Sequence, residues 1–451
     1  MSALQVIILA AGDGTRFKSR TSKVLHKVAG RPILHHVCQA ATDAGAATIA
    51  VVTAPDKPDI EASVAKAFPA ARFFIQAERL GTAHAARMAE PAYAGAEGVV
   101  AVVYGDHPLL RGDNFAEVLR RIEAGFDGAV LGFEPEDPTG YGRLITDGET
   151  LVDIREHRDA SAAEREIGRC NACILAFRAE IFSELIGRIG RDNAQNEYYL
   201  GDLVPLANKA GYRVGFALAP EADVMGVNSR DQLARAEGLY QERLRLKAMR
   251  DGVTLIDPKT VYFAWDTRIA PDVTVEPGVF FGPGVTIATG AVIKAYSHIE
   301  GAHVGENCQV GPFARLRPGA ELMTGARAGN FVEIKNARIA DGAKVNHLTY
   351  IGDAHIGARA NIGAGTITCN YDGVNKHLTE IGADSFIGSN SALVAPVRIG
   401  EGAYIASGSV VTEDVPDDAM AVARGRQINK PGHAATLRAR AEAFKANKTK
   451  G

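Results

Sequence analysis

The second half of the chain has a strict hydrophobic periodicity. Aliphatic or aromatic residues recur every six positions from Ile269 to Ile299, and after a five-residue step the same spacing resumes at Val304. With two more five-residue steps and one longer break, the series continues to Val411. A small or β-branched residue stands two places before many of these positions, and glycine often follows them. This period predicts a parallel β-helix whose aliphatic residues point into a prism and whose corners use glycine, because positive φ is cheap for glycine.

The longest interruption of the period lies between Ile362 and Ile381 and contains the stretch CNYDG, residues 369–373. We expect this interruption to form a loop that projects from the prism. Loops on rigid scaffolds often carry binding residues.

The first half of the chain shows a different pattern, in which short apolar runs alternate with segments of helical spacing. The predicted strands are Val6–Ala10, Thr48–Thr53, Ala71–Gln76, Gly98–Tyr104 and Ala129–Phe133, and Ile33–Ala44 is a predicted helix. Such alternation indicates an α/β domain with a mostly parallel, Rossmann-like sheet. The fold class is therefore α/β followed by all-β.

The domain boundaries follow from changes in composition. Residues 1–228 are expected to form the α/β domain, and 229–250, rich in helix formers, a linker helix. Residues 251–451 would form the β-helix domain, with a basic tail from about residue 424 that is either a solvated segment or a short helix with a frayed end.

Composition narrows the class of protein. The 451 residues carry a net charge of −3, which argues against nucleic acid as the main partner. Five scattered cysteines favour reduced thiols over a disulfide framework. The chain start lacks the features of a signal peptide, and no run approaches the ~20 apolar residues of a membrane helix. We therefore expect a cytoplasmic protein.

A glycine-rich turn follows the first predicted strand. In LAAGDGTR, residues 9–16, the glycines let the backbone approach a phosphate with its amides directed at the oxygens. Arg16 and Lys23 follow closely, and their charges suit a triphosphate. The spacing is not that of a Walker loop. By itself the turn could equally be a tight connection after a strand.

The longer motif LAAGDGTRFKSRTSKVLHKVAGRPIL resembles the signature of sugar-phosphate nucleotidyltransferases. Together with QAERLGTAHA, YGDHPLL, PTGYGR, NAQNEYYLGD, RLRPGAEL, GNFVEIK, HLTYIGDAHIG and NIGAGTITCNYDGVNK, it makes the whole chain similar to the bifunctional N-acetylglucosamine-1-phosphate uridyltransferases/glucosamine-1-phosphate acetyltransferases. The resemblance implies a nucleotide-diphospho-sugar transferase domain followed by a left-handed β-helix. Two departures are Ser22, where that family has proline, and a repeat domain about one coil shorter.

For the first domain, the resemblance implies uridylyl transfer from UTP to N-acetylglucosamine-1-phosphate, with Mg²⁺ as cofactor. It places Mg²⁺ on Asp106 and Asn228, and catalytic charges on Arg16 and Lys23. The implied nucleotide and sugar contacts are Leu9, Ala10, Ala11, Gly12, Lys23, Gln76, Gly81, Thr82, Tyr104, Gly105, Asp106, Gly142, Glu156, Asn171 and Asn228. Oxygen ligands of this kind suit Mg²⁺, and amide groups suit the edge of uracil.

For the second domain, the resemblance implies acetyl transfer from acetyl-CoA to glucosamine-1-phosphate. A histidine, with a reference pKa of ~6.5, can accept the amine proton at neutral pH, and His347 in HLTY is the candidate. His298, His303, His355 and His377 are better explained as corner residues of the repeats. The implied sugar-phosphate contacts are Arg317, Lys335, Tyr350 and Asn361, and the acetyl-CoA contacts are Ala364, Asn370, Tyr371, Ser389, Ser407 and Arg424.

The resemblance also implies a homotrimer, and a product, UDP-N-acetylglucosamine, that feeds peptidoglycan and lipopolysaccharide synthesis. Two alternatives remain. One is a pyrophosphorylase whose repeat domain is purely structural, and the other is a non-catalytic regulatory or scaffold protein. His347 with Lys335 counts against the first, and Arg16, Lys23 and Asp106 count against the second.

Overall fold

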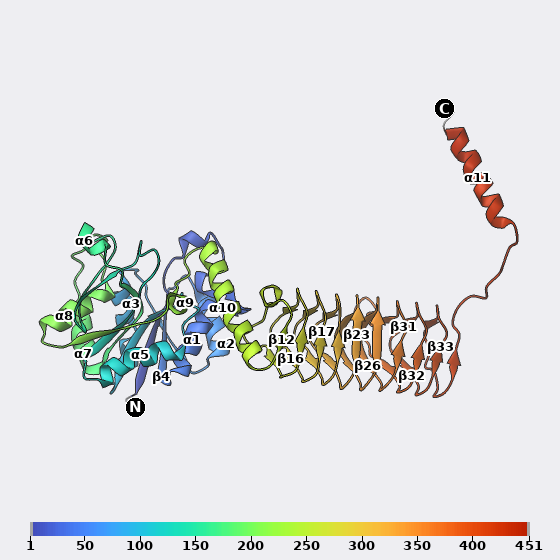
Figure 1. The fold of residues 1–451 in the computed structure, drawn as a ribbon, viewed down its shortest axis with the longest axis horizontal. Coiled ribbons are helices and arrows are strands. Elements are labelled where there is room, and N and C mark those ends of the chain that lie inside the picture. The colour runs from blue at the N-terminus through green and yellow to red at the C-terminus, as the bar shows by residue number, and fades with distance from the viewer. Residues whose placement is uncertain (1–2, 449–451) are drawn as a thin grey trace. The chain divides into compact units, whose positions relative to one another are not determined.

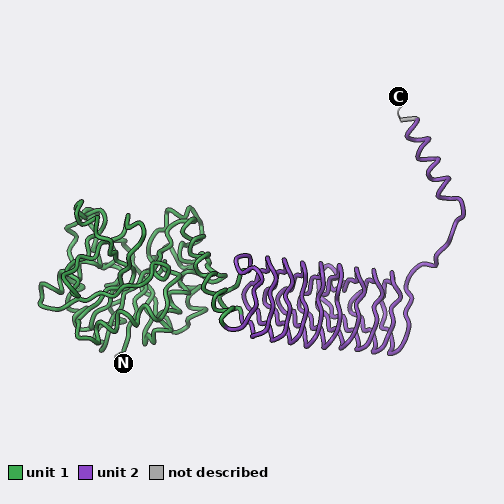
Figure 2. The backbone as a smooth tube through the Cα atoms, viewed as in Figure 1, with its two compact units in different colours: residues 1–250, 262–267 green, residues 251–261, 268–451 purple. Residues whose placement is uncertain are grey.

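The computed structural model describes residues 3–448. They form two compact units, one of residues 3–250 with 262–267 and one of residues 251–261 with 268–448 (Figure 2). In the part of the chain that the structure describes, every helix is too short or too polar to span a lipid bilayer.

The first unit is built on a nine-stranded sheet with the order β5-β4-β1-β6-β10-β7-β11-β9-β8. The strands β5, β4, β1 and β6 are parallel to one another, but β10 runs antiparallel to both β6 and β7. The sheet is thus mixed: the expected parallel order holds for β5, β4, β1 and β6 and for the pair β7 and β11, whereas β10 and β9 run antiparallel to their neighbours. The strands are β1 (Leu4–Leu9), β4 (Ala46–Thr53), β5 (Arg72–Ile75), β6 (Val99–Tyr104), β7 (Gly128–Phe133), β8 (Arg143–Asp147), β9 (Thr150–Arg155), β10 (Cys170–Arg178) and β11 (Val214–Leu218).

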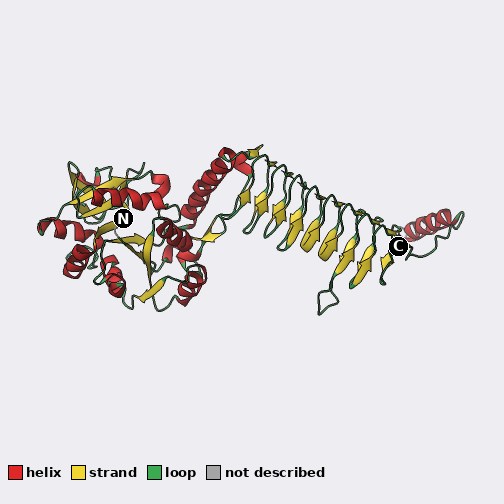
Figure 3. Ribbon diagram, turned by 90° about the horizontal axis from the view of Figure 1, so that it is seen from below, coloured by secondary structure: helices red, strands yellow, loops and turns green. Residues whose placement is uncertain are grey.

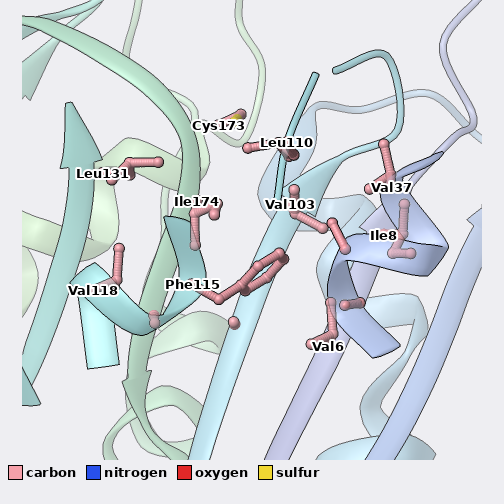
Figure 4. Packing of buried hydrophobic residues seen from close by; sticks show 14 of the residues in the cluster. Val6, Ile8, Val37, Val103, Leu110, Phe115, Val118, Leu131, Cys173 and Ile174 are labelled. Carbon is pink, nitrogen blue, oxygen red and sulfur yellow. The ribbon is translucent and has the colours of Figure 1, made fainter. Parts of the chain in front are cut away.

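Helices cover both faces of this sheet, because alternate strand residues point to opposite sides. Val6 and Ile8 pack with one helical layer, in a core that also contains Phe115 and Val118 (Figure 4). Ile7 packs with the other layer. The first layer is α1 (Ile33–Asp43), α2 (Pro58–Ala67) and α5 (Gly112–Glu123), and the second is α3 (Thr82–Met88), α4 (Glu90–Tyr93), α7 (Ala179–Leu185) and α8 (Leu203–Lys209) (Figure 1).

The predicted linker helix forms as α10 (Arg230–Arg250) and packs onto the first unit. Ala236 is fully buried in a cluster with Phe17 and Met225. The Gln241 side chain donates to Phe263 O at 2.7 Å and accepts from Phe263 N at 2.8 Å, which ties residues 262–267 to the same unit. The helix therefore has a packed core of its own within the first unit.

The second unit is a parallel β-helix, as the six-residue period predicts. Its strands pair coil to coil and make three faces. Apart from Ile269, which is partly exposed, the periodic aliphatic residues are buried. The first face is β12 (Thr254–Leu255), β14 (Thr274–Val275), β17 (Val292–Ile293), β20 (Gln309–Val310), β23 (Arg327–Asn330), β25 (Lys344–His347), β27 (Asn361–Ile362), β30 (Phe386–Ile387), β33 (Tyr404–Ile405) and β35 (Met420–Ala421).

The other two faces share two long strands, β24 (Glu333–Ile339) and β26 (Tyr350–Ile356), which bend around a corner. The second face is β13 (Arg268–Ile269), β16 (Thr286–Ile287), β19 (His303–Val304), β22 (Ala320–Leu322), the later halves of β24 and β26, β29 (Thr379–Ile381) and β32 (Val397–Ile399). The third face is β15 (Phe280–Phe281), β18 (His298–Ile299), β21 (Arg315–Leu316), the earlier halves of β24 and β26, β28 (Ile367–Cys369), β31 (Ala392–Val394) and β34 (Val410–Val411).

The expected projecting loop is present but shorter than the interruption of the period. Ile367–Cys369 still forms a prism strand, β28, and the loop spans residues 370–378 (Figure 3). It closes through a bridge between Tyr371 and Lys376. The basic tail contains a helix, α11 (His433–Lys448), whose described residues are exposed.

Candidate functional site

The glycine-rich turn opens onto a cavity of about 490 Å³ in the first unit. The strands β1 and β6 are parallel, so Leu9 and Tyr104 end at the same edge of the sheet, where α/β folds bind ligands. All but one of the expected nucleotide and sugar contacts line the cavity. The lining contains Leu9, Ala10, Ala11, Gly12, Lys23, Gln76, Gly81, Thr82, Tyr104, Asp106, Gly142, Glu156, Asn171 and Asn228.

Two expected residues lie elsewhere. Gly105 is not part of the lining, and a Cβ at this position would lie 2.9 Å from Leu9 O, so glycine is required for the backbone approach. Arg16, in a short 3-10 helix after the turn, is exposed and also outside the lining.

An ion pair stands at the centre of the lining. Lys23 Nζ donates to Asp106 Oδ2 at 2.5 Å and to Asn228 Oδ1 at 3.0 Å. The loop that carries Asn228 is fixed beside Asp106 by a bond from Val227 N to Asp106 O at 2.9 Å. Burial by itself would raise the pKa of the Asp106 carboxyl, but Lys23 and His107 outweigh burial and hold this pKa well below its usual range. Asp106 is therefore a carboxylate at neutral pH.

The same oxygens fit a magnesium ion. Asp106 Oδ1 is buried and has no hydrogen-bond partner among the described residues, although His107 Nδ1 lies 2.8 Å from it. A carboxylate and an amide oxygen that converge on one point are ligands Mg²⁺ prefers. In the structure this point is taken by the Lys23 ammonium.

A further group of the expected contacts, Gly142, Glu156 and Asn171, lines the same cavity. Asn171 N donates to Gly142 O at 2.7 Å, which holds these two residues together. Burial, followed by Asp159 and Asp202, raises the pKa of Glu156. Gln76 is buried and its side-chain amide donates to Gly81 O at 3.1 Å, so two of the expected nucleotide contacts touch each other.

Sequence reasoning missed six polar residues that also line the cavity: Arg79, His107, Tyr141, Gln195, Glu197 and Tyr199. All six lie inside the motifs QAERLGTAHA, YGDHPLL, PTGYGR and NAQNEYYLGD, and their position there was the available signal.

In the β-helix, His347 ends β25 at the corner between the first and third faces. His347 Nδ1 lies 2.7 Å from Asn330 Oδ1, its register partner on the preceding coil. Backbone hydrogen bonds link His347, Ala364, Ser389 and Ser407 from one coil to the next. Gly365 N, directly after Ala364, donates to His347 O; Asn390 N, directly after Ser389, donates to Ala364 O; and Gly408 N, directly after Ser407, donates to Ser389 O. The candidate base and the expected acetyl-CoA contacts Ala364, Ser389 and Ser407 therefore form one column along a single corner.

Three of the expected sugar-phosphate contacts lie together on the third face. Arg317 and Lys335 occupy equivalent positions on successive coils, and Lys335 pairs with Gly352. The Tyr350 hydroxyl lies over Gly352, because a Cβ there would be 2.4 Å from it. Arg317 also pairs with Glu333 at 2.8 Å.

The remaining expected contacts are more dispersed. Asn361 is on the first face, between Lys344 and Phe386. Asn370, at the base of the loop, is buried and donates to Asp353, whereas Tyr371 is exposed under Lys376 Nζ, 4.1 Å from its ring centroid. Arg424 is exposed beside Gly408.

Comparison with known proteins agrees with this architecture. Residues 6–184 match the family model of the MobA-like NTP transferase domain, and residues 378–413 match that of the bacterial transferase hexapeptide (six repeats). The chain is 58% identical over 443 residues to the bifunctional protein GlmU of Maricaulis maris, covering 98% of both chains. It is 54% identical over 437 residues to the protein of the same name from Azorhizobium caulinodans, covering 97% of this chain and 98% of that one. The chain therefore belongs to the GlmU family of bifunctional proteins.

Proposed function

We propose that the first unit transfers a uridylyl group from UTP to N-acetylglucosamine-1-phosphate and releases pyrophosphate. The observation that carries this proposal is the single cavity lined by the glycine turn, Gln76 and the Lys23–Asp106–Asn228 cluster. The glycine turn would bind the triphosphate, Gln76 the uracil, and Gly142 with Asn171 the sugar.

In this reaction a phosphate oxygen of the sugar phosphate attacks the α-phosphorus, and pyrophosphate leaves. The sugar phosphate is already ionised at neutral pH, so the chain needs to orient the two substrates and neutralise charge rather than remove a proton. Asp106 and Asn228 would hold Mg²⁺, which supplies charge neutralisation when bound. Lys23 then turns from these oxygens toward the phosphates.

We further propose that the β-helix acetylates glucosamine-1-phosphate with acetyl-CoA. His347 accepts the amine proton as the amine attacks the thioester carbonyl and the CoA thiolate leaves. If Asn330 Oδ1 accepts from His347 Nδ1, the basic lone pair is placed on Nε2. Arg317 and Lys335 bind the sugar phosphate, and the corner column with Asn370, Tyr371 and Arg424 binds the acyl donor.

We also propose that the protein assembles as a homotrimer. It would work in the cytoplasm and supply precursors of peptidoglycan and lipopolysaccharide. An exposed aromatic ladder next to the corner column supports self-association. The rings of Tyr296, Phe313 and Phe331 stack at 5.2 and 5.3 Å, and all three residues have positive φ, which is rare for bulky side chains. Sedimentation velocity would test the trimer, and a monomer at micromolar concentration would exclude it.

The activities are tested by supplying glucosamine-1-phosphate, acetyl-CoA, UTP and Mg²⁺ to the purified protein and following CoA thiol and pyrophosphate in parallel. We expect both products, with pyrophosphate dependent on prior acetyl transfer. His347→Ala should abolish CoA release and spare pyrophosphate release from supplied N-acetylglucosamine-1-phosphate. Pyrophosphate release without CoA release in the wild type would instead support a single-activity enzyme with a structural repeat domain.

A further inference from the structure

The glycine turn is held by two cations that belong to other segments. Arg79 Nε donates to Ala11 O at 2.9 Å, and Lys57 Nζ donates to Gly12 O. Lys57 directly precedes α2 and Arg79 lies shortly before α3, so the turn is fixed from two separate segments, of which the one with Arg79 also lines the cavity. Burial lowers the pKa of Lys57, with Arg79 as the next cause, which reflects how closely the two cations approach.

These contacts fix the direction of the backbone amides. In a planar trans peptide the C=O and N–H groups point in opposite directions. Holding Ala11 O and Gly12 O therefore turns the Gly12 and Asp13 N–H groups to the opposite side. Within residues 3–448, neither of these N–H groups has a protein hydrogen-bond acceptor. Free amides held in one orientation are the means by which a glycine turn binds phosphate.

Arg79 makes more of these contacts than Lys57 does. Besides Ala11 O, its guanidinium pairs with Asp13 at 2.9 Å and with Asp56 at 2.7 Å. The hydrogen bond from Arg79 is the main cause of the lowered pKa of Asp56. One planar fork thus contacts the turn at Ala11 and Asp13 and joins it to Asp56, a geometry that a lysine could satisfy only in part.

We propose that Arg79 is a positioning residue of uridylyl transfer, which holds the glycine turn with its amides open to the triphosphate of UTP. The inference rests on the proposed function of the first unit. Arg79 acts through the backbone oxygen of Ala11 and the side-chain carboxylate of Asp13, so its loss should weaken nucleotide binding more than it slows the chemical step.

The test compares Arg79→Gln and Arg79→Lys with the wild type and with Arg121→Gln. Arg121 also forms a salt bridge with an exposed carboxylate, Glu149, but does not line the cavity. For Arg79→Gln we expect the KM for UTP to rise about tenfold, while kcat stays within about threefold and the KM for N-acetylglucosamine-1-phosphate is unchanged. Arg79→Lys should recover part of the loss, and Arg121→Gln should match the wild type.

Titration calorimetry with UTP and no sugar phosphate gives a second readout that does not need turnover. If Arg79→Gln binds UTP as tightly as the wild type does, the inference is wrong. It is also wrong if kcat and both KM values change together, because that pattern indicates a general loss of structure. If the wild type binds UTP but releases no pyrophosphate, the proposed function fails while the UTP affinities of the variants still decide the role of Arg79.

Discussion

Replacement of Lys23 by methionine tests how the first site balances its charges. The Lys23 ammonium lies between Asp106 Oδ2 and Asn228 Oδ1, the two oxygens proposed to hold Mg²⁺. Lysine and metal therefore compete for one position. Lys23→Met should destabilise the metal-free protein, and Mg²⁺ should restore more stability to this variant than to the wild type.

The loss of stability expected for Lys23→Met follows from the burial of the Lys23–Asp106 ion pair. The Lys23 and Asp106 side chains are 13% and 17% exposed, and removing one partner of a buried pair costs about 3–5 kcal/mol. His107 still faces Asp106, so we expect the lower end, about 3 kcal/mol. In a unit of this size, this corresponds to a fall in Tm of about 6–12 °C. A site with a Kd of about 1 mM would regain about 1.4 kcal/mol in 10 mM Mg²⁺.

The protein offers a reporter for the first unit alone. Trp265 is the only tryptophan of the chain. The backbone N–H of Trp265 donates to Ala29 O at 2.9 Å, and the Arg31 guanidinium lies 4.1 Å from the centroid of its ring, both within that unit. Thermal unfolding followed by tryptophan fluorescence, with and without 10 mM Mg²⁺ (about ten times that Kd), therefore measures the relevant transition. Lys27→Met, at an exposed position, is the matched control.

Two outcomes would refute this reasoning. If Mg²⁺ raises the Tm of Lys23→Met no more than that of the wild type, the metal does not bind between Asp106 and Asn228. If Lys23→Met is as stable as Lys27→Met without metal, the ion pair does not stabilise the fold. Uridylyl transfer by Lys23→Met should fall at least about a hundredfold, because a cation aimed at the phosphates is lost.

Three further predictions concern separate parts of the chain. Asn330→Ala should lower kcat for acetyl transfer up to about tenfold, because it removes one hydrogen bond that orients His347; unchanged CoA release would contradict this. Burial raises the pKa of Asp202 to about 6, above its unfolded value of 3.8, so its favourable contribution is present at low pH and lost as pH rises through 6. Asp202→Asn should therefore add about 1 kcal/mol of stability at pH 7.5, a figure reduced for solvent screening. The gain should shrink as the pH falls from about 6 toward the unfolded pKa of 3.8, and a gain in urea unfolding that is independent of pH would be inconsistent with this origin. Ile351→Ala, at a fully buried prism position, should destabilise the β-helix by about 2–5 kcal/mol, measured by circular dichroism, and a loss below 1 kcal/mol would indicate that the prism interior is loosely packed.

Several elements and their order could be predicted from the amino-acid sequence. In the β-helix each coil repeats the same local rule, so the six-residue spacing alone predicted which residues, such as Val275 and Ile405, are buried. The strands β1, β4 and β6 of the first unit were also predictable, because short buried runs next to a glycine turn are local signals. The antiparallel β10 between β6 and β7 was not, since strand direction depends on how the chain returns across the sheet.

Which side chains meet depends on how the chain folds. The contact between Asn330 and His347 depends on coil-to-coil register, and neither residue type signals it. Likewise Lys23 meets Asp106 and Asn228, and Arg79 meets Ala11, through segments far apart along the chain. Periodicity is a local property that the sequence displays directly. The ion pair of Lys23 and the positioning of the glycine turn, by contrast, depend on contacts that form only when distant segments come together in the folded sheet domain.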